Sequence, residues 1–372
     1  MSSAPEVAEG APRPFTLVAE LTYRCPLRCA YCSNPVTTSQ RSTELGVHDW
    51  QRVIGEAEAL GVVHVHFTGG EPLLHGQLET LVASARSADL YVNLITSGVP
   101  LSRARLASLC DAGLEHVQLS FQAATPELGR HIAGLDALEQ KLRVAGWVRE
   151  LGMALTVNVV LHRQNAHELP ALLRLAEGLH PSRIEIANAQ YLGWALKNRA
   201  GLLPSAAQLE QARKLVAETR ERLRGEIDIL FVLPDYHAGR ARACMQGWAQ
   251  RYLIVTPDGL LLPCQAARDL ADLQFDDVRS APLAELWAKS PALQRFRGDS
   301  WLPQPCRACD ERHRDFGGCR CQAFQLTGDE SAADPACRLT PARREHELMR
   351  RQAERPVGVE PLVLRGPPGN AG

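Results

Sequence analysis

The sequence predicts an α/β fold in which a parallel sheet with intervening helices is followed by a cysteine-rich module. Two observations predict it. From residue 15 to about residue 190, short β-rich runs alternate with amphipathic segments of helical length, whereas residues 298–337 are rich in Cys, Gly, Arg and Asp and lack apolar periodicity. Repeated strand–helix units require parallel strands, because each crossover returns the chain to the same end of the sheet. The periodicity leaves open whether that sheet is open or closed.

The individual elements follow in order along the chain. Six strands are expected at residues 15–21, 62–67, 91–96, 116–121, 155–161 and 183–189. Helical spacing of apolar residues is found at residues 48–60, 76–87, 103–112, 135–151 and 168–177. A further helix is expected at 206–223, where Ser205 and Gln208 form a capping box. Residues 251–263 predict two strands joined by a turn at Pro257-Asp258-Gly259.

These elements predict a division of the chain into domains. A disordered tail is expected at residues 1–13, the α/β domain at 14–225, the cysteine-rich domain at 226–340 and a C-terminal tail at 341–372. Within the last segment, residues 355–372 are rich in Pro, Gly and Ala and are expected to be disordered. Residues 298–337 have too few apolar residues for a core of their own, so we expect metal to be needed for the folding of this segment.

Composition excludes several classes of protein. The chain has 372 residues, 45% of them hydrophobic, and a net charge of −1, so it can form a core but has no positive field for nucleic acid. It has no apolar run of the roughly 18 residues needed to cross a bilayer, and its first residues lack a secretion signal. We therefore expect a cytoplasmic protein that binds neither nucleic acid nor membrane. Eleven cysteines in a reducing compartment favour metal ligation over disulfides.

Three of these cysteines lie on one predicted loop after the first strand. Cys25, Cys29 and Cys32 have the spacing Cys-x3-Cys-x2-Cys. A [4Fe-4S] cube held by three thiolates keeps one iron open for a ligand from outside the protein. A structural zinc ion is the alternative, and it would need a fourth ligand from elsewhere.

The segment LTYRCPLRCAYCSNP resembles the signature of radical S-adenosylmethionine (SAM) enzymes, and Phe67–Pro72 (FTGGEP) resembles their second motif. The resemblance implies a partial (β/α)6 barrel whose open iron binds SAM. It also implies cofactor contacts from Gly69, Gly70 and Glu71, from Ser97 after the third strand and from Ser120 in the fourth.

The family often has a downstream arginine that pairs with the methionine carboxylate. Here Arg130 lies one residue before the expected position, so Arg130 and His131 are both candidates for this role. Asn158 is a further polar residue expected to face the barrel.

The C-terminal cysteines resemble the SPASM domain of peptide-modifying radical enzymes. The resemblance implies two auxiliary iron–sulfur clusters, with Asp315 at a position where the usual pattern has cysteine. A carboxylate is a hard donor that can ligate iron. By position, one cluster is assigned to Cys306, Cys309, Asp315 and Cys337, and the other, either [2Fe-2S] or [4Fe-4S], to Cys244, Cys264, Cys319 and Cys321. Zinc sites, and ligation by His313, are the alternatives.

Two segments, 188–199 and 314–324, closely resemble the PqqA peptide cyclase family of pyrroloquinoline quinone biosynthesis. The resemblance implies that reductive cleavage of SAM generates a radical that joins a glutamate to a tyrosine in a precursor peptide, PqqA. It also implies a peptide chaperone, PqqD, and a flavodoxin or ferredoxin reductant. Maturation of another peptide or protein, by thioether formation or sulfatase activation, is the alternative within this chemistry, and a non-catalytic iron–sulfur or zinc scaffold is the alternative outside it.

Some residues were considered for roles that the resemblance leaves open. Candidates for a general base are His162, Asp235 and His237. Candidates for the wall of a peptide pocket are Tyr191, Trp194 and Asn198. Cys110 belongs to neither cysteine group, and its place on a predicted helix favours a small buried hydrophobic residue.

Overall fold

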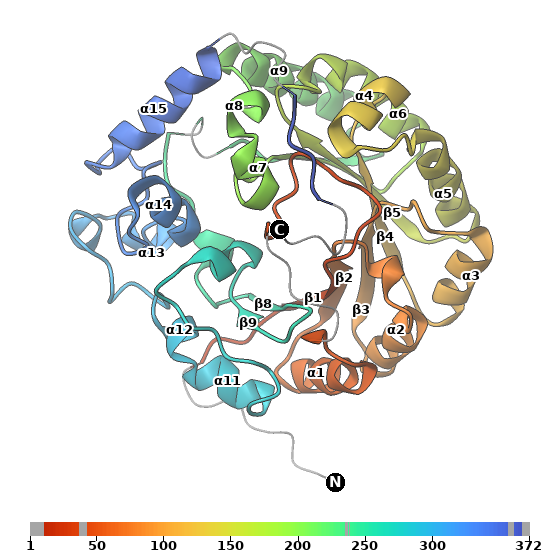
Figure 1. Ribbon diagram of the computed structural model, residues 1–372, viewed down its shortest axis with the longest axis horizontal. Coiled ribbons are helices and arrows are strands. Elements are labelled where there is room, and N and C mark those ends of the chain that lie inside the picture. Colours follow the sequence, from red (N-terminus) through yellow and green to blue (C-terminus); the bar gives the residue numbers. More distant parts are fainter. Residues whose placement is uncertain (1–10, 37–42, 235–236, 238, 356–360, 367–372) are drawn as a thin grey trace.

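A computed structural model describes residues 11–36, 43–234, 237, 239–355 and 361–366. Its centre is a nine-stranded sheet in the order β7-β6-β5-β4-β3-β2-β1-β8-β9. All neighbouring strands are parallel except β8 and β9, which are antiparallel. The sheet is open, with β7 and β9 at its edges, and it curves so that helices α1 to α6 cover its outer side (Figure 1). The fold is therefore the predicted partial barrel.

All six strands expected from the periodicity are present, and the hairpin expected at 251–263 is present as well. A short seventh strand extends the sheet beyond β6. The strands are β1 (Thr16–Thr22), β2 (His64–Gly69), β3 (Tyr91–Thr96), β4 (His116–Phe121), β5 (Ala154–Leu161), β6 (Arg183–Asn188), β7 (Asp228–Phe231), β8 (Tyr252–Val255) and β9 (Leu261–Leu262).

The helices of the barrel match the predicted segments, and three short helices, α4, α7 and α8, are additional. Helix α4 (Pro126–Ala133) starts at Pro126, and Gly134 ends it in a left-handed conformation just before the predicted segment 135–151. The others are α1 (Val47–Ala59), α2 (Leu78–Ser87), α3 (Arg103–Asp111), α5 (Leu138–Glu150), α6 (Leu169–Gly178), α7 (Gly193–Lys197), α8 (Arg199–Leu202) and α9 (Ala206–Arg222).

The main core lies between the sheet and these helices. Alternate residues of the parallel strands, such as Leu17, Val65 and Val117, are fully buried on the helix side. Because every strand of this inner set runs in the same direction, their carboxyl ends and the following loops meet at one end of the barrel. Cys110 on α3 packs against this core and is half-buried, as a small hydrophobic residue would be.

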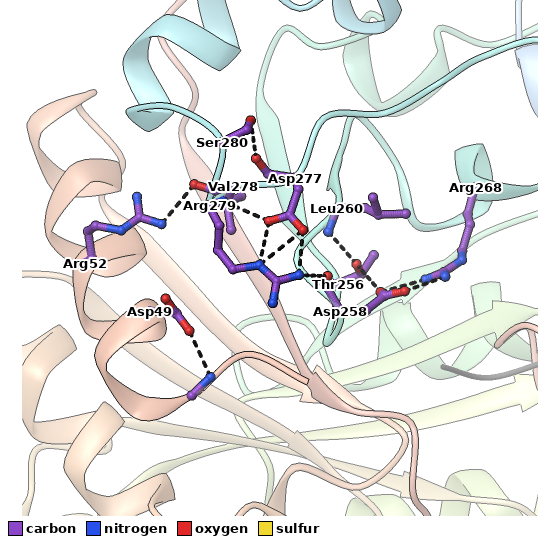
Figure 2. A network of polar contacts seen from close by, with 11 residues as sticks. Asp49, Arg52, Thr256, Asp258, Leu260, Arg268, Asp277, Val278, Arg279 and Ser280 are labelled. Carbon is purple, nitrogen blue, oxygen red and sulfur yellow. Dashed lines mark hydrogen bonds and ion pairs between the residues drawn. The ribbon is translucent and has the colours of Figure 1, made fainter. Parts of the chain in front are cut away.

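The C-terminal part consists of short elements. They are η4 (Cys244–Gln246), η5 (Gln265–Asp269), α11 (Leu283–Lys289), α12 (Pro291–Gln294), η6 (Cys306–Ala308), α13 (Arg312–Asp315) and α14 (Arg320–Thr327). Polar contacts join this part to the barrel beside β8 and β9 (Figure 2). The Arg52 guanidinium of α1 donates to the Val278 carbonyl at 2.9 Å. Arg268 and Asp258 form an ion pair across the hairpin, with 2.6 Å between nitrogen and oxygen.

The end of the chain differs from the predicted tail. Residues Arg343–Glu354 form helix α15, which packs against α9 and α14 and buries His346, Met349 and Ala353. Residues 361–366 lie against the barrel, and Arg365 is only 8% exposed. The expectation of disorder was wrong for residues 361–366, and residues 343–354 form a packed helix where a tail was expected, because their partners belong to distant segments that composition does not reveal. Residues 1–10, 356–360 and 367–372 lie outside the described part of the chain.

Candidate active site

The three-cysteine loop follows β1 at the carboxyl end of the barrel. Its backbone is fastened to α4, where Arg28 N–H donates to the Ala133 carbonyl at 2.8 Å and Ala30 N–H donates to the Ile132 carbonyl at 2.9 Å. Cys25, Cys29 and Cys32 line one cavity of about 320 Å³, together with backbone from the Gly69–Gly70 turn. We call this space the barrel cavity.

Burial governs the ionisation of two of these thiols. It raises the pKa of Cys25 to about 12 and that of Cys29 to about 11. Both of these thiols are therefore protonated at neutral pH in the absence of metal, and metal binding would release their protons. Three convergent sulfur donors beside an open cavity fit an iron–sulfur cluster with one accessible iron.

The glycine turn after β2 lies directly against this loop. Gly70 N–H donates to the Thr22 carbonyl at 2.6 Å. A Cβ on Gly69 would lie 2.4 Å from the Thr22 carbonyl oxygen, and one on Gly70 would lie 2.4 Å from that of Arg24. Gly69 also has a φ of +126°, which L side chains rarely adopt. Glycine is thus required at both positions for the close approach of the two segments.

Glu71 is completely buried and bonded within the protein. Its carboxylate accepts hydrogen bonds from the Thr96 hydroxyl at 2.6 Å and from Ser97 N–H at 2.9 Å, and the Ser97 hydroxyl donates to it as well. Burial raises the pKa of Glu71, and these hydrogen bonds oppose that shift. The residue thereby joins the end of β2 to the end of β3. Ser97 and Ser120 line the barrel cavity, whereas the Glu71 side chain does not.

The structure does not place Arg130 at the barrel cavity. Its side chain is 63% exposed and lies 3.9 Å from Asp136, and His131 is exposed on the same helix. Two other cations border the cysteine loop, Lys141 and Arg365. Sequence reasoning missed both, because a lysine on an amphipathic helix and an arginine in a Pro/Gly-rich tail are ordinarily solvent-exposed.

Lys141 on α5 is fully buried beneath the cysteine loop. Its ammonium donates to the Ser120 carbonyl at 2.7 Å and to the Gln122 side chain, whose amide donates to the Tyr31 hydroxyl at 2.9 Å. Burial lowers the pKa of Lys141 to about 8, and the neighbouring thiols and Glu71 oppose that shift. A charged lysine here is stabilised by negative charge on the loop, as metal-bound thiolates would provide.

The candidate bases and pocket residues have different surroundings. His162 is buried with its ring 5.3 Å from that of Tyr31, and burial lowers its pKa to about 3. It does not line the barrel cavity. Among the other candidates His237 is half-buried and Asp235 lies outside the described residues. Tyr191 lines a second cavity, described below, whereas the Asn198 amide is engaged with backbone groups.

Two further polar residues are also engaged elsewhere. Asn158 on β5 hydrogen-bonds Glu185 on β6. The His313 ring lies 3.0 Å from a carboxylate oxygen of Asp299, and its side chain is 62% exposed. The structure therefore gives His313 a surface partner away from the cysteines.

The C-terminal cysteines form two groups in space that match the two predicted sets. In the first group, the sulfur atoms of Cys264 and Cys321 are 3.9 Å apart, and Cys244 contacts both Cys264 and Cys319. All four thiols line a cavity of about 320 Å³, which we call the cysteine cavity. Residues 57 positions apart in the chain are thus brought together by the fold.

In the second group, Cys306, Cys309, Asp315 and Cys337 line a smaller cavity. The Asp315 carboxylate accepts a hydrogen bond from Gly317 N–H at 2.9 Å, which positions it at the end of α13. Within the described part of the chain, no three His, Cys, Asp or Glu side chains are placed to hold a single metal ion. The protein ligands of an iron–sulfur cluster bind different irons, so they do not have to converge on one metal ion. The four donors around each cavity therefore fit a cluster as a set.

The barrel cavity and the cysteine cavity share a wall. Asn188 at the end of β6 and the following Ala189 and Gln190 line both of them. Gln265, which is next to Cys264 and lines the barrel cavity, donates to the Glu20 carboxylate of β1 at 2.7 Å. Burial raises the pKa of Glu20 to about 6. The two cysteine-lined spaces are therefore neighbours, joined by direct contacts between the barrel and the C-terminal part.

Comparison with known proteins agrees with this arrangement. Residues 19–176 match the radical SAM superfamily, and residues 244–310 match SPASM, an iron–sulfur cluster-binding domain. The chain is 49% identical to a PqqA peptide cyclase of Bradyrhizobium diazoefficiens over 92% of its own length and 90% of the relative's. It is 48% identical to one of Granulibacter bethesdensis, over 96% of this chain and 95% of the relative.

The chain belongs to the PqqA peptide cyclase family. It is a radical SAM enzyme, and the two matched domains imply a [4Fe-4S] cluster with SAM and auxiliary iron–sulfur clusters. The name of these relatives describes them as cyclases of a peptide, PqqA. Each helix in the described ranges is too short or too polar to cross a membrane.

Solved structures support the fold of this PqqA cyclase family member. Streptococcus suis SuiB bound to S-adenosylmethionine superposes with a TM-score of 0.74 at 17% identity, covering 88% of this chain and 77% of SuiB. SuiB has also been solved bound to its precursor peptide SuiA. The protein anSMEcpe with bound AdoMet superposes with a TM-score of 0.63 at 17% identity, covering 91% of this chain and 97% of that one.

Proposed function

We propose that this enzyme forms a carbon–carbon bond between a glutamate and a tyrosine side chain of a PqqA precursor peptide. The observation that carries the proposal is the wall shared by the barrel cavity and the cysteine cavity. A peptide at this wall would be accessible both to the three-cysteine loop and to the first C-terminal cysteine group. The names of the relatives support the same substrate.

The chain's own donor groups suit the cofactors of this chemistry. Cys25, Cys29 and Cys32 would hold the [4Fe-4S] cluster, and Gly69 and Gly70 would allow SAM to lie against the backbone. When bound, the cluster and SAM supply the one-electron chemistry that removes a hydrogen atom from an unreactive carbon. The auxiliary clusters would be held by the two C-terminal groups, with Asp315 as the oxygen ligand of its group.

The protein itself positions these groups. Glu71 fixes the two strand ends beneath the barrel cavity through its hydrogen bonds to Thr96 and Ser97. Ser97 and Ser120 would contact SAM from the cavity wall, and Arg130 has no such position. The segment after β6 would contact the peptide, because Tyr191 and Leu192 line the cysteine cavity.

The remaining partners belong to the same proposal. PqqD would present the peptide, and a flavodoxin or ferredoxin would supply electrons. The cysteine cavity is lined by apolar residues such as Leu233 and Leu326 and by the charged residue Arg242, which suits a peptide with both apolar and charged residues. We propose that this step belongs to the early stage of pyrroloquinoline quinone biosynthesis, in the cytoplasm.

The decisive experiment is anaerobic turnover of a PqqA peptide with PqqD, SAM and a reductant. The expected product is lighter than the peptide by two hydrogen atoms, with the loss mapped by fragmentation to one glutamate and one tyrosine. Unchanged peptide mass together with continued SAM consumption would contradict the proposal and favour another peptide or protein substrate. Cys29→Ala should abolish the product, whereas Cys110→Ala, a cysteine outside all three groups, should retain it.

A further inference from the structure

The end of the chain is attached to the cysteine loop by paired hydrogen bonds. Val363 N–H donates to the Asn198 side-chain oxygen at 2.7 Å, and the Asn198 amide donates back to the Val363 carbonyl at 2.8 Å. Arg365 N–H donates to the Arg28 carbonyl at 3.2 Å, and the Arg28 guanidinium donates back to the Arg365 carbonyl at 2.6 Å. Residues 361–366, which we call the strap, thus bind the loop and lie beside α8 (Figure 1).

The strap and the loop also share a common anchor. The Asn198 amide that holds Val363 donates to the Ala30 carbonyl at 2.9 Å, and Ala30 lies between Cys29 and Cys32. A Cβ on Gly134 at the end of α4 would contact both Arg28 and Leu364, which shows how closely the strap packs on the loop. Displacement of the strap would therefore disturb the backbone that carries the cysteines.

The Arg365 side chain extends from the strap into the barrel cavity. Its guanidinium donates to the Tyr23 carbonyl, two residues before Cys25, and one nitrogen lies 3.8 Å from the Cys32 sulfur. The residue is only 8% exposed, and among the described residues it forms no ion pair with a carboxylate. A buried cation without an anionic partner is costly, so its surroundings are expected to supply negative charge when the site is loaded.

Hydrogen bonds to cluster sulfur atoms are one of the means by which a protein tunes a cluster. A fixed cation at the same place stabilises the more negative, reduced state over the oxidised state. We propose that the strap positions the cysteine loop and that Arg365, by donating an N–H to the Cys32 sulfur, raises the reduction potential of the cluster held there. This inference rests on the proposed ligand role of Cys32 and is independent of the identity of the peptide.

The test is a redox titration of the reconstituted full-length enzyme, monitored by electron paramagnetic resonance without any peptide. The loop cluster is identified as the signal that SAM perturbs. Arg365→Gln should shift its midpoint potential to a more negative value, Arg365→Lys should restore part of the shift, and the exposed control Arg344→Gln should match the parent. A parent-like potential in Arg365→Gln at full iron content would overturn the inference.

A second variant covers the case in which Arg365→Gln loses its cluster. Val363→Pro removes the backbone N–H that donates to Asn198 and leaves the Arg365 side chain chemically unchanged. Because the strap would then hold Arg365 less firmly, this variant should shift the midpoint potential in the same direction. An unchanged potential in Val363→Pro would show that the strap does not position the loop. If Arg365→Gln loses iron and Arg365→Lys loses it as well, Arg365 has only a packing role. That result would also overturn the proposed effect of its charge on the cluster.

These outcomes are separable from those of the proposed function. If the potential shifts as expected but the parent enzyme leaves the PqqA peptide unchanged, the strap inference stands and the proposed substrate is wrong. If the peptide is cross-linked but the potential does not move, the substrate stands and the role of Arg365 is wrong.

Discussion

The three-cysteine loop and the C-terminal cysteine groups are held by different means. The loop lies at the ends of parallel strands whose buried residues form one continuous core, and Glu71 ties two of those ends together. Both C-terminal groups lie among short helices and turns, but only Cys244, Cys264 and Cys321 of the first group belong to the main core. Around the second group, the local packing cluster consists of Leu302, Cys306 and Ala333 with Trp301 against them. The loop is thus built on a folded scaffold, whereas the second C-terminal group is part of a scaffold with little core of its own.

Polar side chains partly replace the missing core in the C-terminal region. The buried Arg320 guanidinium donates to the Ala332 carbonyl at 2.8 Å and the Glu330 carbonyl at 3.0 Å, and it lies 4.6 Å from the Trp301 ring. The Asp334 carboxylate accepts hydrogen bonds from Cys319 N–H at 2.7 Å and Ala336 N–H at 2.8 Å. These hydrogen bonds fix the turns around the cysteines, but they do not supply the apolar packing that the barrel core has.

Removal of iron should give the largest difference between the two regions. Chelation of the clusters under reducing conditions should increase hydrogen exchange across residues 298–337, because that region has little core to replace its metal ligands. Strands β1 to β6 should keep their protection. Hydrogen exchange with mass spectrometry measures both regions in one experiment, and equal loss of protection in the barrel would contradict the comparison.

Gly70→Ala should damage the barrel site strongly. The added methyl group would lie 2.4 Å from the Arg24 carbonyl oxygen and 2.5 Å from that of Tyr23, so the turn and the cysteine loop must separate. We expect a loss of about 3 kcal/mol in unfolding free energy and loss of iron from the loop cluster. Denaturant unfolding and iron analysis measure these effects. Gly76→Ala is the matched control, because its Cβ would meet no atom within 4 Å.

Asp315→Ala should act on a single C-terminal group. Loss of an oxygen ligand should lower the iron content of that cluster while the SAM-sensitive signal of the loop cluster is retained. Asp315→Cys should keep the cluster with an altered spectrum and potential. The exposed neighbour Asp310 provides the control, and iron content and spectrum equal to those of Asp310→Ala would show that Asp315 is not a ligand.

The smallest expected effect is the pH dependence of barrel stability. At the amino ends of the strands, burial lowers the pKa of His66 and of His116 from 6.5 to about 4. Below pH 6.5 the unfolded chain therefore binds protons at these histidines, whereas the folded barrel keeps them neutral. The unfolding free energy is thus unaffected by these histidines above pH 6.5 and decreases from pH 6.5 towards pH 4. Between pH 7.5 and 5.5 each histidine should remove about 1 kcal/mol of stability.

His66→Gln should reduce this loss by about 1 kcal/mol, because one of the buried histidines is then absent. Thermal unfolding followed by circular dichroism at the two pH values measures the difference. The exposed His48→Gln should behave as the parent does. A pH dependence in His66→Gln equal to that of the parent would show that His66 is protonated in the folded barrel.

The sequence alone determined the parts of this protein that local patterns encode. Alternating strand and helix periods predicted the strands from β1 to β6, and the spacing of Cys25, Cys29 and Cys32 predicted a common loop after β1. The two sets of C-terminal residues were also assigned from order along the chain, and the structure groups them in the same way. The strand and helix periods and the spacing of the three cysteines are readable because each depends on neighbours a few residues apart.

Only the tertiary structure decided which charged residues lie at the site. Arg130 follows the motifs closely in sequence but is exposed, whereas Lys141 and Arg365 are buried beside the cysteine loop. Arg365 is 333 residues from Cys32, and no local pattern links the two. The burial of a charged residue and its electrostatic partners depend on how distant segments of the chain pack together. Periodicity and spacing describe only nearby residues, so they do not predict these surroundings.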